Sequence, residues 1–350
     1  LGVKMESERI LGQNHILRHF ENAIRMGKIS HAYIINGEEG SGKMNLAIHF
    51  AKALQCERNN SNKAINEDGE RIAVPGTACG QCKSCKQTDS KNQPDIKYIT
   101  YEKSGIGVDE IREQINDDID IKPYSSPYKI YIVPESEKMT VQAQNALLKT
   151  IEEPPEYAII ILLTTNADTF LQTILSRCVM LNIRPVKEDI IKNQLTSQYG
   201  VGDYEARVAA TFSNGNPGKA IKLATSEEFK ELKQYVVGMF MSLEKGGMDI
   251  IGEAIKKIGT FKKQIDEYFS LMRIWFRDIL VYKATKEEDQ IIFQDEYMTI
   301  EKMSQTYSFD DINDILKAID LAESRIKSNV NFDSTIEILL LSIKEKTSGK

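Results

Sequence analysis

Residues 37–44 read GEEGSGKM, and this glycine-rich stretch is the strongest constraint on what the chain can fold into. It matches the pattern GxxxxGK, in which backbone N–H groups and a lysine cradle phosphate. The pattern is informative only where a strand precedes it and a helix follows it. Residues 32–36 are apolar and strand-like, and residues 44–56 carry apolar side chains at helical spacing. We therefore expect a phosphate loop within an α/β domain.

The rest of the chain changes character at Pro185. Before it, residues 96–100, 129–133, 158–165 and 179–183 read as further strands, and residues 141–152 read as a helix. The nearly continuous apolar run at 158–165 is typical of a parallel strand that is covered on both faces. After Pro185 only helical patterns follow. We expect an α/β domain over residues 1–185, a small helical domain over 186–226 and a helical domain over 227–350.

Two positions that normally hold Mg²⁺ in an ATP site carry other residues. Met44 stands where a Ser or Thr hydroxyl would bind the ion, and Pro134 follows the apolar strand where an aspartate is expected. Backbone amides near Gly37, Gly40, Gly42 and Lys43 can still attract a phosphate without metal. Hydrolysis needs the ion, because Mg²⁺ neutralises charge on the transferred phosphoryl group. We expect a degenerate site that does not use ATP and Mg²⁺ productively.

Cysteines form the second chemical motif. Cys79, Cys82 and Cys85 make two overlapping CxxC units, and Cys56 offers a fourth thiolate at the end of the preceding helix. Thiolates at this spacing can surround one tetrahedral Zn²⁺. His49 is a weaker candidate ligand. With four protein ligands and no open position, the ion would be structural, in an insertion that spans about residues 56–85.

Charge and hydropathy exclude some functions. The net charge of −6 argues against nucleic-acid binding through the overall field of the protein. No apolar stretch approaches the roughly 20 residues that a membrane-spanning helix needs, and the first residues show no secretory signal pattern. We expect a cytoplasmic protein with no membrane partner.

Four strings occur in a specific order: ILGQNHILRHFENAIRMGKISHAYIINGEEGSGK, the cysteine cluster, NALLKTIEEPP and LLTTNADTFLQTILSRC. In that order they resemble the clamp-loader branch of the AAA+ proteins. The resemblance is strong over residues 10–224. It implies that a small helical lid follows the α/β domain and that the C-terminal helices form an oligomerising collar.

The departures from the family pattern indicate the kind of subunit. Gly218, in GNPGKA, stands where motor subunits carry a nucleotide-sensing arginine. With Met44 and Pro134 also changed, the chain resembles a non-hydrolysing stator subunit. The resemblance implies that Arg177, in the SRC triplet, reaches a neighbour's ATP as an arginine finger, with Thr165 at a sensor position. From the residues alone, Arg177 reads as a surface arginine paired with a carboxylate.

The implied partners are the clamp-loader subunits gamma or tau and delta, and, through the assembled complex, the sliding clamp and primer-template DNA. The chain would then belong to a replicative polymerase holoenzyme without an activity of its own. Two alternatives stay open from the sequence. One is a motor-type subunit that hydrolyses ATP despite Met44, and the other is a free-standing zinc protein that binds nucleic acid directly.

Overall fold

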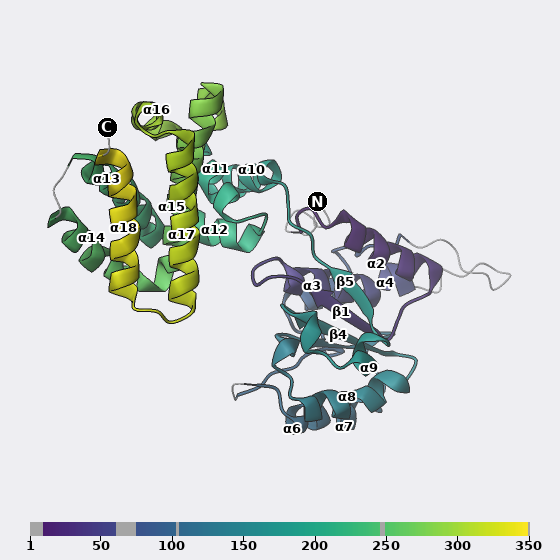
Figure 1. Cartoon of the computed structure of the whole chain (residues 1–350). Helices are drawn as coiled ribbons and strands as arrows, with labels where there is room; N and C mark the ends of the chain where they lie inside the picture. Colours follow the sequence, from purple (N-terminus) through teal and green to yellow (C-terminus); the bar gives the residue numbers. More distant parts are fainter. Residues whose placement is uncertain (1–9, 61–74, 103–104, 246–248, 349–350) are drawn as a thin grey trace. The chain divides into compact units, whose positions relative to one another are not determined.

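The computed structural model describes residues 10–60, 75–102, 105–245 and 249–348 (Figure 1). The chain divides into two compact units, which are described separately below. The first comprises residues 1–191 and 213–219, and the second comprises residues 192–212 and 220–350. The predicted division into three domains, with boundaries after residues 185 and 226, stays a prediction.

A five-stranded parallel sheet in the order β2-β3-β4-β1-β5 is the centre of the first unit. The strands are β1 (Ala32–Asn36), β2 (Ile96–Tyr98), β3 (Lys129–Val133), β4 (Ala158–Thr164) and β5 (Val179–Asn182). All seven residues of β4 are buried. The prediction of an apolar strand covered on both faces is therefore confirmed.

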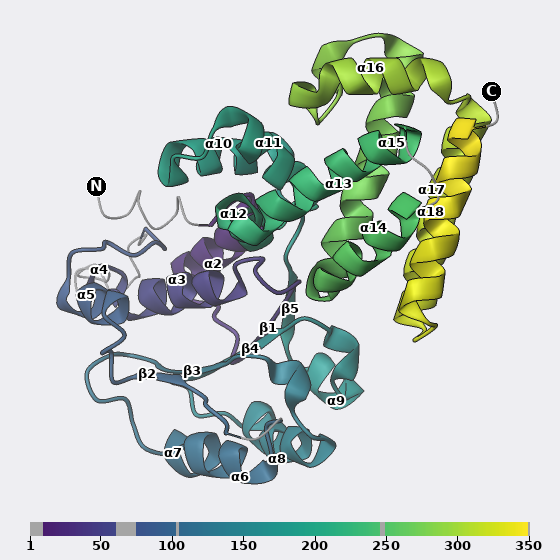
Figure 2. The same cartoon turned by 90° about the vertical axis from the view of Figure 1, so that its left-hand side faces the viewer.

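Helices pack against both faces of this sheet (Figure 2). They are α2 (Asn14–Met26), α3 (Lys43–Gln55), α4 (Glu57–Asn60), α5 (Lys83–Asp89), α6 (Val108–Ile111), α7 (Asp117–Ile119), α8 (Val141–Glu152) and α9 (Gln172–Leu175), with one π-helical turn (Arg112–Asn116) joining α6 to α7. In Figure 2, α2 and α3 lie on one side of the sheet and α6, α7 and α8 lie on the other.

Alternate residues of β4 enter two separate hydrophobic cores. Ile161 packs in one core with Phe20 of α2 and Phe50 of α3, whose rings stack 4.0 Å apart. Ile160 packs in the other core with Leu147 of α8. This alternation follows from the two-residue period of a strand, which sends successive side chains to opposite faces. The sheet thereby fixes the loops that follow β1, β3 and β4 at one edge.

All the secondary structure described in the second unit is helical. The helices that lie wholly or mostly in it are α10 (Glu188–Tyr199), α11 (Asp203–Phe212), α12 (Pro217–Thr225), α13 (Glu227–Lys245), α14 (Asp249–Thr260), α15 (Ile265–Thr285), α16 (Tyr297–Thr306), α17 (Phe309–Lys327) and α18 (Phe332–Ser348). The expected α/β fold followed by helices is confirmed.

Trp275 on α15 lies in the core of the second unit. It is fully buried, and its ring stacks on Phe240 of α13 at 5.7 Å. Nearby, the buried carboxylate of Asp278 accepts the backbone N–H groups of Ile292 and Phe293, each at 2.8 Å. These contacts fix the segment after α15.

No helix in the described part of the chain is long and apolar enough to cross a membrane.

Candidate functional site

Four cysteines converge beside the first hydrophobic core. The sulfur atoms of Cys56, Cys79, Cys82 and Cys85 all lie within 4.8 Å of one another. Cys56 directly follows α3, Cys82 caps the N-terminus of α5, and Cys85 lies one turn into that helix. A bond of 2.5 Å between Lys52 of α3 and Asp89 of α5 ties the same two helices together. The structure therefore brings together all four cysteines that the sequence proposed as ligands.

The spacing of the sulfurs suits a tetrahedral metal site. Cys79 Sγ and Cys85 Sγ are 3.9 Å apart, and four sulfurs about 2.3 Å from one zinc ion would lie about 3.8 Å from one another. Backbone N–H groups also point at the sulfurs. Cys79 N–H donates to Cys56 Sγ at 3.3 Å, and Cys82 N–H donates to Cys79 Sγ at 3.4 Å. Such bonds stabilise negative charge on sulfur, so the donor set fits a closed thiolate site.

Contacts within the cluster change the pKa values of Cys56 and Cys85 in opposite directions. A hydrogen bond from Cys85 lowers the pKa of Cys56 to about 4, while the same bond raises the pKa of Cys85. Burial raises the pKa of Cys82. In the absence of a cation the cluster thus favours one thiolate among neighbouring thiols. A divalent ion would favour deprotonation of the others, because metal ligands bind as thiolates.

The fifth cysteine, Cys178, and the weaker candidate ligand His49 lie outside this group. Cys178 packs at the margin of the second core, and burial raises the pKa of its thiol to about 12. His49 is buried on α3, where burial lowers the pKa of its imidazole. Neither residue belongs to the cluster found among the described residues.

The phosphate loop connects β1 to α3, as the sequence predicts. Gly40 and Gly42 adopt positive φ values of 79° and 94°, which glycine permits at low cost. Lys43 Nζ donates to the carbonyl oxygens of Gly37 at 2.6 Å and Glu38 at 2.8 Å. Two of the three N–H donors of the lysine are therefore bonded within its own loop.

A second segment packs directly on this loop. The Gly218 N–H donates to the Gly40 carbonyl at 3.1 Å, and Asn216 Nδ2 donates to the Glu39 carbonyl at 2.7 Å. A Cβ atom at Gly218 would lie only 2.4 Å from the Gly40 oxygen. Position 218 is therefore a close contact between two backbones, and a side chain there would require the backbone of the loop to shift.

Beside the loop lies an open cavity of about 670 Å³. Lys43, Met44, Pro134, Glu135 and Glu137 contribute to its walls. Met44 and Pro134 bring neither the hydroxyl nor the carboxylate that would position Mg²⁺. Burial lowers the pKa of Lys43 from its usual value.

Glu135 and Glu137, two of the carboxylates in this cavity, each have a protein partner. Glu135 accepts hydrogen bonds from Lys138 at 2.8 Å and from Tyr101, and the bond from Lys138 lowers the pKa of Glu135. Glu137 accepts from Thr165 at 2.7 Å. The sequence singled out Thr165 but missed Glu137. No motif marks Glu137, because the bond joins residues that are distant in the chain.

Arg177 lies on the surface just after α9. Its guanidinium donates to Thr173 O at 3.0 Å and pairs with Glu152 Oε1, at the end of α8, at 3.0 Å. Both members of this pair are about 40% exposed. The structure thus shows the carboxylate pairing that the residues alone suggested.

Two family models match parts of this chain. Residues 12–187 match the family model described as DNA polymerase III, delta subunit, and residues 252–345 match the model of its C-terminal part. The chain belongs to the DNA polymerase III delta-subunit family. The expected membership of the clamp-loader group is thereby confirmed.

Individual relatives refine this result. The chain is 27% identical over 337 residues to the DNA polymerase III subunit delta' of Bacillus subtilis, and the match covers 95% of this chain and 96% of that protein. It is 29% identical over 298 residues to subunit tau of the same bacterium, covering 79% of this chain but only 50% of tau. The end-to-end similarity is thus to delta', as the pattern of substituted residues predicted.

A solved structure of a gamma-subunit-related protein from Thermotoga maritima is 21% identical. The alignment covers 95% of this chain and 99% of that one. The TM-score of this alignment is 0.41.

Proposed function

We propose that this member of the delta-subunit family is the delta prime subunit, or stator, of a bacterial clamp loader. In this role it supports loading of the sliding clamp onto primed DNA and does not hydrolyse ATP itself. The contact of Gly218 with Gly40 carries the proposal, because a motor subunit needs a sensing side chain at that position. The bonds from Lys43 to its own loop and the positions of Met44 and Pro134 agree with it.

The test is reconstitution with gamma or tau, delta and the sliding clamp. We expect one ring-like complex by native mass spectrometry, and clamp loading that depends on this chain. The purified chain alone should hydrolyse no ATP with Mg²⁺ present. Robust Mg²⁺-dependent hydrolysis by the chain alone would instead favour the alternative, an ATP-hydrolysing subunit of the gamma or tau type.

Within that complex we propose that Arg177 acts on the ATP of a neighbouring subunit. Its ion pair with Glu152 is exposed, and such pairs contribute only about 0–1 kcal/mol. The guanidinium can therefore leave Glu152 at little cost when a phosphate is offered. Its planar fork can hold two phosphate oxygens at once, and this would stabilise charge on the partner's γ-phosphate.

We propose that Cys56, Cys79, Cys82 and Cys85 bind one structural Zn²⁺. Four sulfur ligands leave no open position for a substrate, so the ion would act by joining the end of α3 to the start of α5. Metal analysis of protein purified without chelator should find about one zinc per chain. A chain that holds no metal, yet keeps its fold and stability, would refute this assignment.

The remaining assignments follow from the same role. We propose that residues 186–226 form the lid and residues 227–350 the collar that contacts gamma or tau and delta. Primer-template DNA and the clamp would be reached through the assembled complex in the cytoplasm. Limited proteolysis followed by pull-down with gamma or tau tests the collar. Retained binding by a chain truncated after residue 226 would contradict it.

A further inference from the structure

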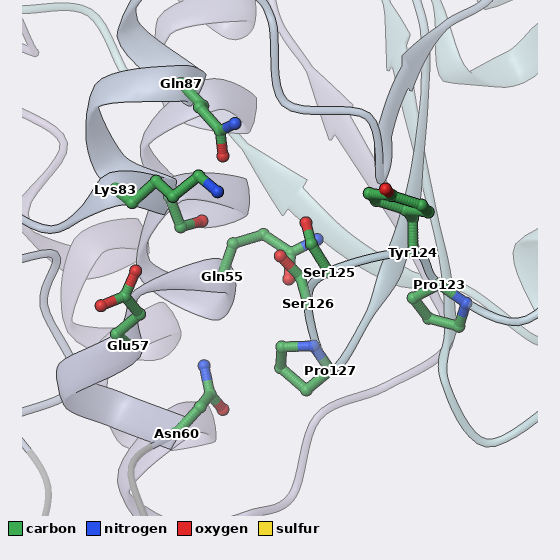
Figure 3. A pocket seen from close by; sticks show the side chains of 11 residues that line it. Gln55, Glu57, Asn60, Lys83, Gln87, Pro123, Tyr124, Ser125, Ser126 and Pro127 are labelled. Carbon is green, nitrogen blue, oxygen red and sulfur yellow. The ribbon is translucent and has the colours of Figure 1, made fainter.

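A polar cavity of about 510 Å³ lies next to the cysteine cluster and away from the phosphate loop. Its walls come from the end of α3, from α4 and α5, and from the loop of residues 123–127 before β3. Figure 3 shows Gln55 extending from the end of α3 toward Ser125 and Ser126 on the opposite loop. Neither the ATP site nor the arginine finger uses any of these residues.

Gln55 gives this cavity a buried acceptor. Only 2% of the residue is exposed. Its Nε2 donates to the Tyr128 carbonyl at 2.6 Å, which fixes the orientation of the amide. Its Oε1 accepts no hydrogen bond from any described residue. An unsatisfied buried acceptor costs about 1–3 kcal/mol, so an N–H or O–H donor that enters the cavity is favoured.

Two serines supply the complementary donors. Gln93 Nε2 donates to Ser84 Oγ and to Ser126 Oγ, each at 2.9 Å. Each hydroxyl oxygen therefore accepts the bond from Gln93, and its hydrogen stays available for another acceptor. Among the described residues, no hydrogen bond has either of these hydroxyls as its donor. The cavity thus offers one oriented acceptor and two hydroxyl groups that can donate.

The loop that closes the cavity is held in place before any ligand arrives. The carboxylate of Asp95, 2% exposed, accepts the N–H of Tyr124 at 2.5 Å and that of Ser125 at 2.9 Å. The Tyr124 side chain remains free, since the residue is 88% exposed. In Figure 3, Tyr124 and Pro123 lie close together, and Pro127 lies nearer to Ser126, so apolar groups flank the polar ones. Such pre-organisation lowers the entropy cost of binding.

We propose that this cavity binds an extended peptide segment of a partner protein. A peptide group carries an N–H for Gln55 Oε1 and a carbonyl for the serine hydroxyls, while Tyr124 and the prolines can pack an apolar or proline side chain. The charges also favour a peptide over nucleic acid. Lys83 and Glu57 contribute opposite charges to the rim, so a phosphate gains no net attraction there.

The metal cluster and the cavity share two structural elements. Gln55 immediately precedes Cys56, and Ser84 lies between Cys82 and Cys85 on α5. Any ion that fixes the cysteines therefore fixes two groups that contact the peptide. This arrangement gives the cysteine-rich insertion a recognition role beyond its own stability.

The experiment selects peptides from a random twelve-residue display library on the full-length, zinc-supplemented chain, and measures their affinity by fluorescence anisotropy. Tyr124→Ala and Ser126→Ala are the test variants. Tyr199→Ala and Ser197→Ala are matched controls at exposed positions on α10. We expect each test variant to weaken binding at least tenfold and each control to leave it unchanged. Circular dichroism verifies that every variant is folded.

Two results would overturn the proposal. The first is a library that yields no peptide able to distinguish the wild-type chain from the two test variants. The second is salt-sensitive binding of a fluorescein-labelled twelve-nucleotide oligo(dT) that Tyr124→Ala abolishes, which would assign the cavity to single-stranded nucleic acid. Neither result bears on ATP hydrolysis or subunit assembly, so it would leave the clamp-loader role untouched.

Discussion

Replacing Gly218 by alanine tests whether the phosphate loop is closed by close backbone packing. The added Cβ would lie 2.4 Å from the carbonyl oxygen of Gly40 and 2.8 Å from the Cα of Gly40. Ordinary C···O contacts are about 3.3 Å, so the two segments must separate by about 0.9 Å. Both neighbours are backbone atoms, and no flexible side chain can yield. Gly218 does not have a positive φ, so the cost arises from the contact alone.

The expected loss of stability can be worked from these distances. Overpacking of this kind costs about 1–3 kcal/mol. Separation by about 0.9 Å would also lengthen the 3.1 Å bond from Gly218 N–H to Gly40 O beyond hydrogen-bonding range, which adds about 0.5–1.5 kcal/mol. Because separation relieves part of the overlap, the two costs do not add fully. We expect a decrease of about 2–3 kcal/mol in the free energy of unfolding.

Urea unfolding followed by circular dichroism measures the change, and hydrogen exchange locates it. Amide protection should fall at residues 37–43 and 216–219, with little change elsewhere. Gly238→Ala is the matched control, because Gly238 lies within α13 with no atom within 4 Å of an added Cβ. That substitution should stabilise the chain by up to about 1 kcal/mol through helix propensity. Equal stability of Gly218→Ala and wild type, with unchanged exchange, would refute the reasoning.

Three further predictions follow. Removing zinc with a chelator should lower the melting temperature and increase hydrogen exchange at the end of α3 and in α5, whereas a metal-free chain with unchanged exchange would contradict the structural role. Arg177→Ala should change stability by less than about 1 kcal/mol but lower the clamp- and DNA-stimulated ATPase of the reconstituted complex, by up to about 10³-fold at the affected site. Arg177→Lys should not restore it, and Glu152→Ala should keep wild-type rates. Burial opposes ionisation of Asp118, but hydrogen bonds from two lysines and a tyrosine outweigh it and lower its pKa. Asp118→Asn should therefore cost about 1–3 kcal/mol at pH 7, and this difference from wild type should shrink as the pH falls below about 4.

Local patterns explain what the sequence could predict. The bounds of β1, β3 and α8 agree with the expected segments, because each has a clear apolar period and a turn residue at its end. The cysteine spacing likewise brought three candidate ligands together within a short segment, and Cys56 joined them because α3 and α5 pack side by side. Only β2 is clearly shorter than expected, ending at Tyr98.

Contacts between distant segments escaped prediction. The Gln55 amide is oriented by Tyr128, 73 residues away, and Glu137 meets Thr165 across 28 residues. Neither residue belongs to a motif, and a glutamine at a helix end is unremarkable by composition. Such sites depend on which segments the sheet places side by side. No pattern in the sequence could have identified the cavity beside α5.

Gly218 shows how the two kinds of information combine. In the sequence, Gly218 indicates only that the nucleotide-sensing arginine expected from the family resemblance is absent. That absence alone says nothing about how position 218 packs against the phosphate loop. In the structure the same position lets the backbone of α12 approach Gly40 and donate a hydrogen bond to it. Any side chain there, arginine included, would collide with the loop. The absence of a Cβ at position 218 therefore permits the close contact with the loop and also leaves no side chain there that could contact a nucleotide. Restoring Mg²⁺ ligands at positions 44 and 134 would leave that contact in place, so we expect a chain with both ligands restored to remain without ATP hydrolysis.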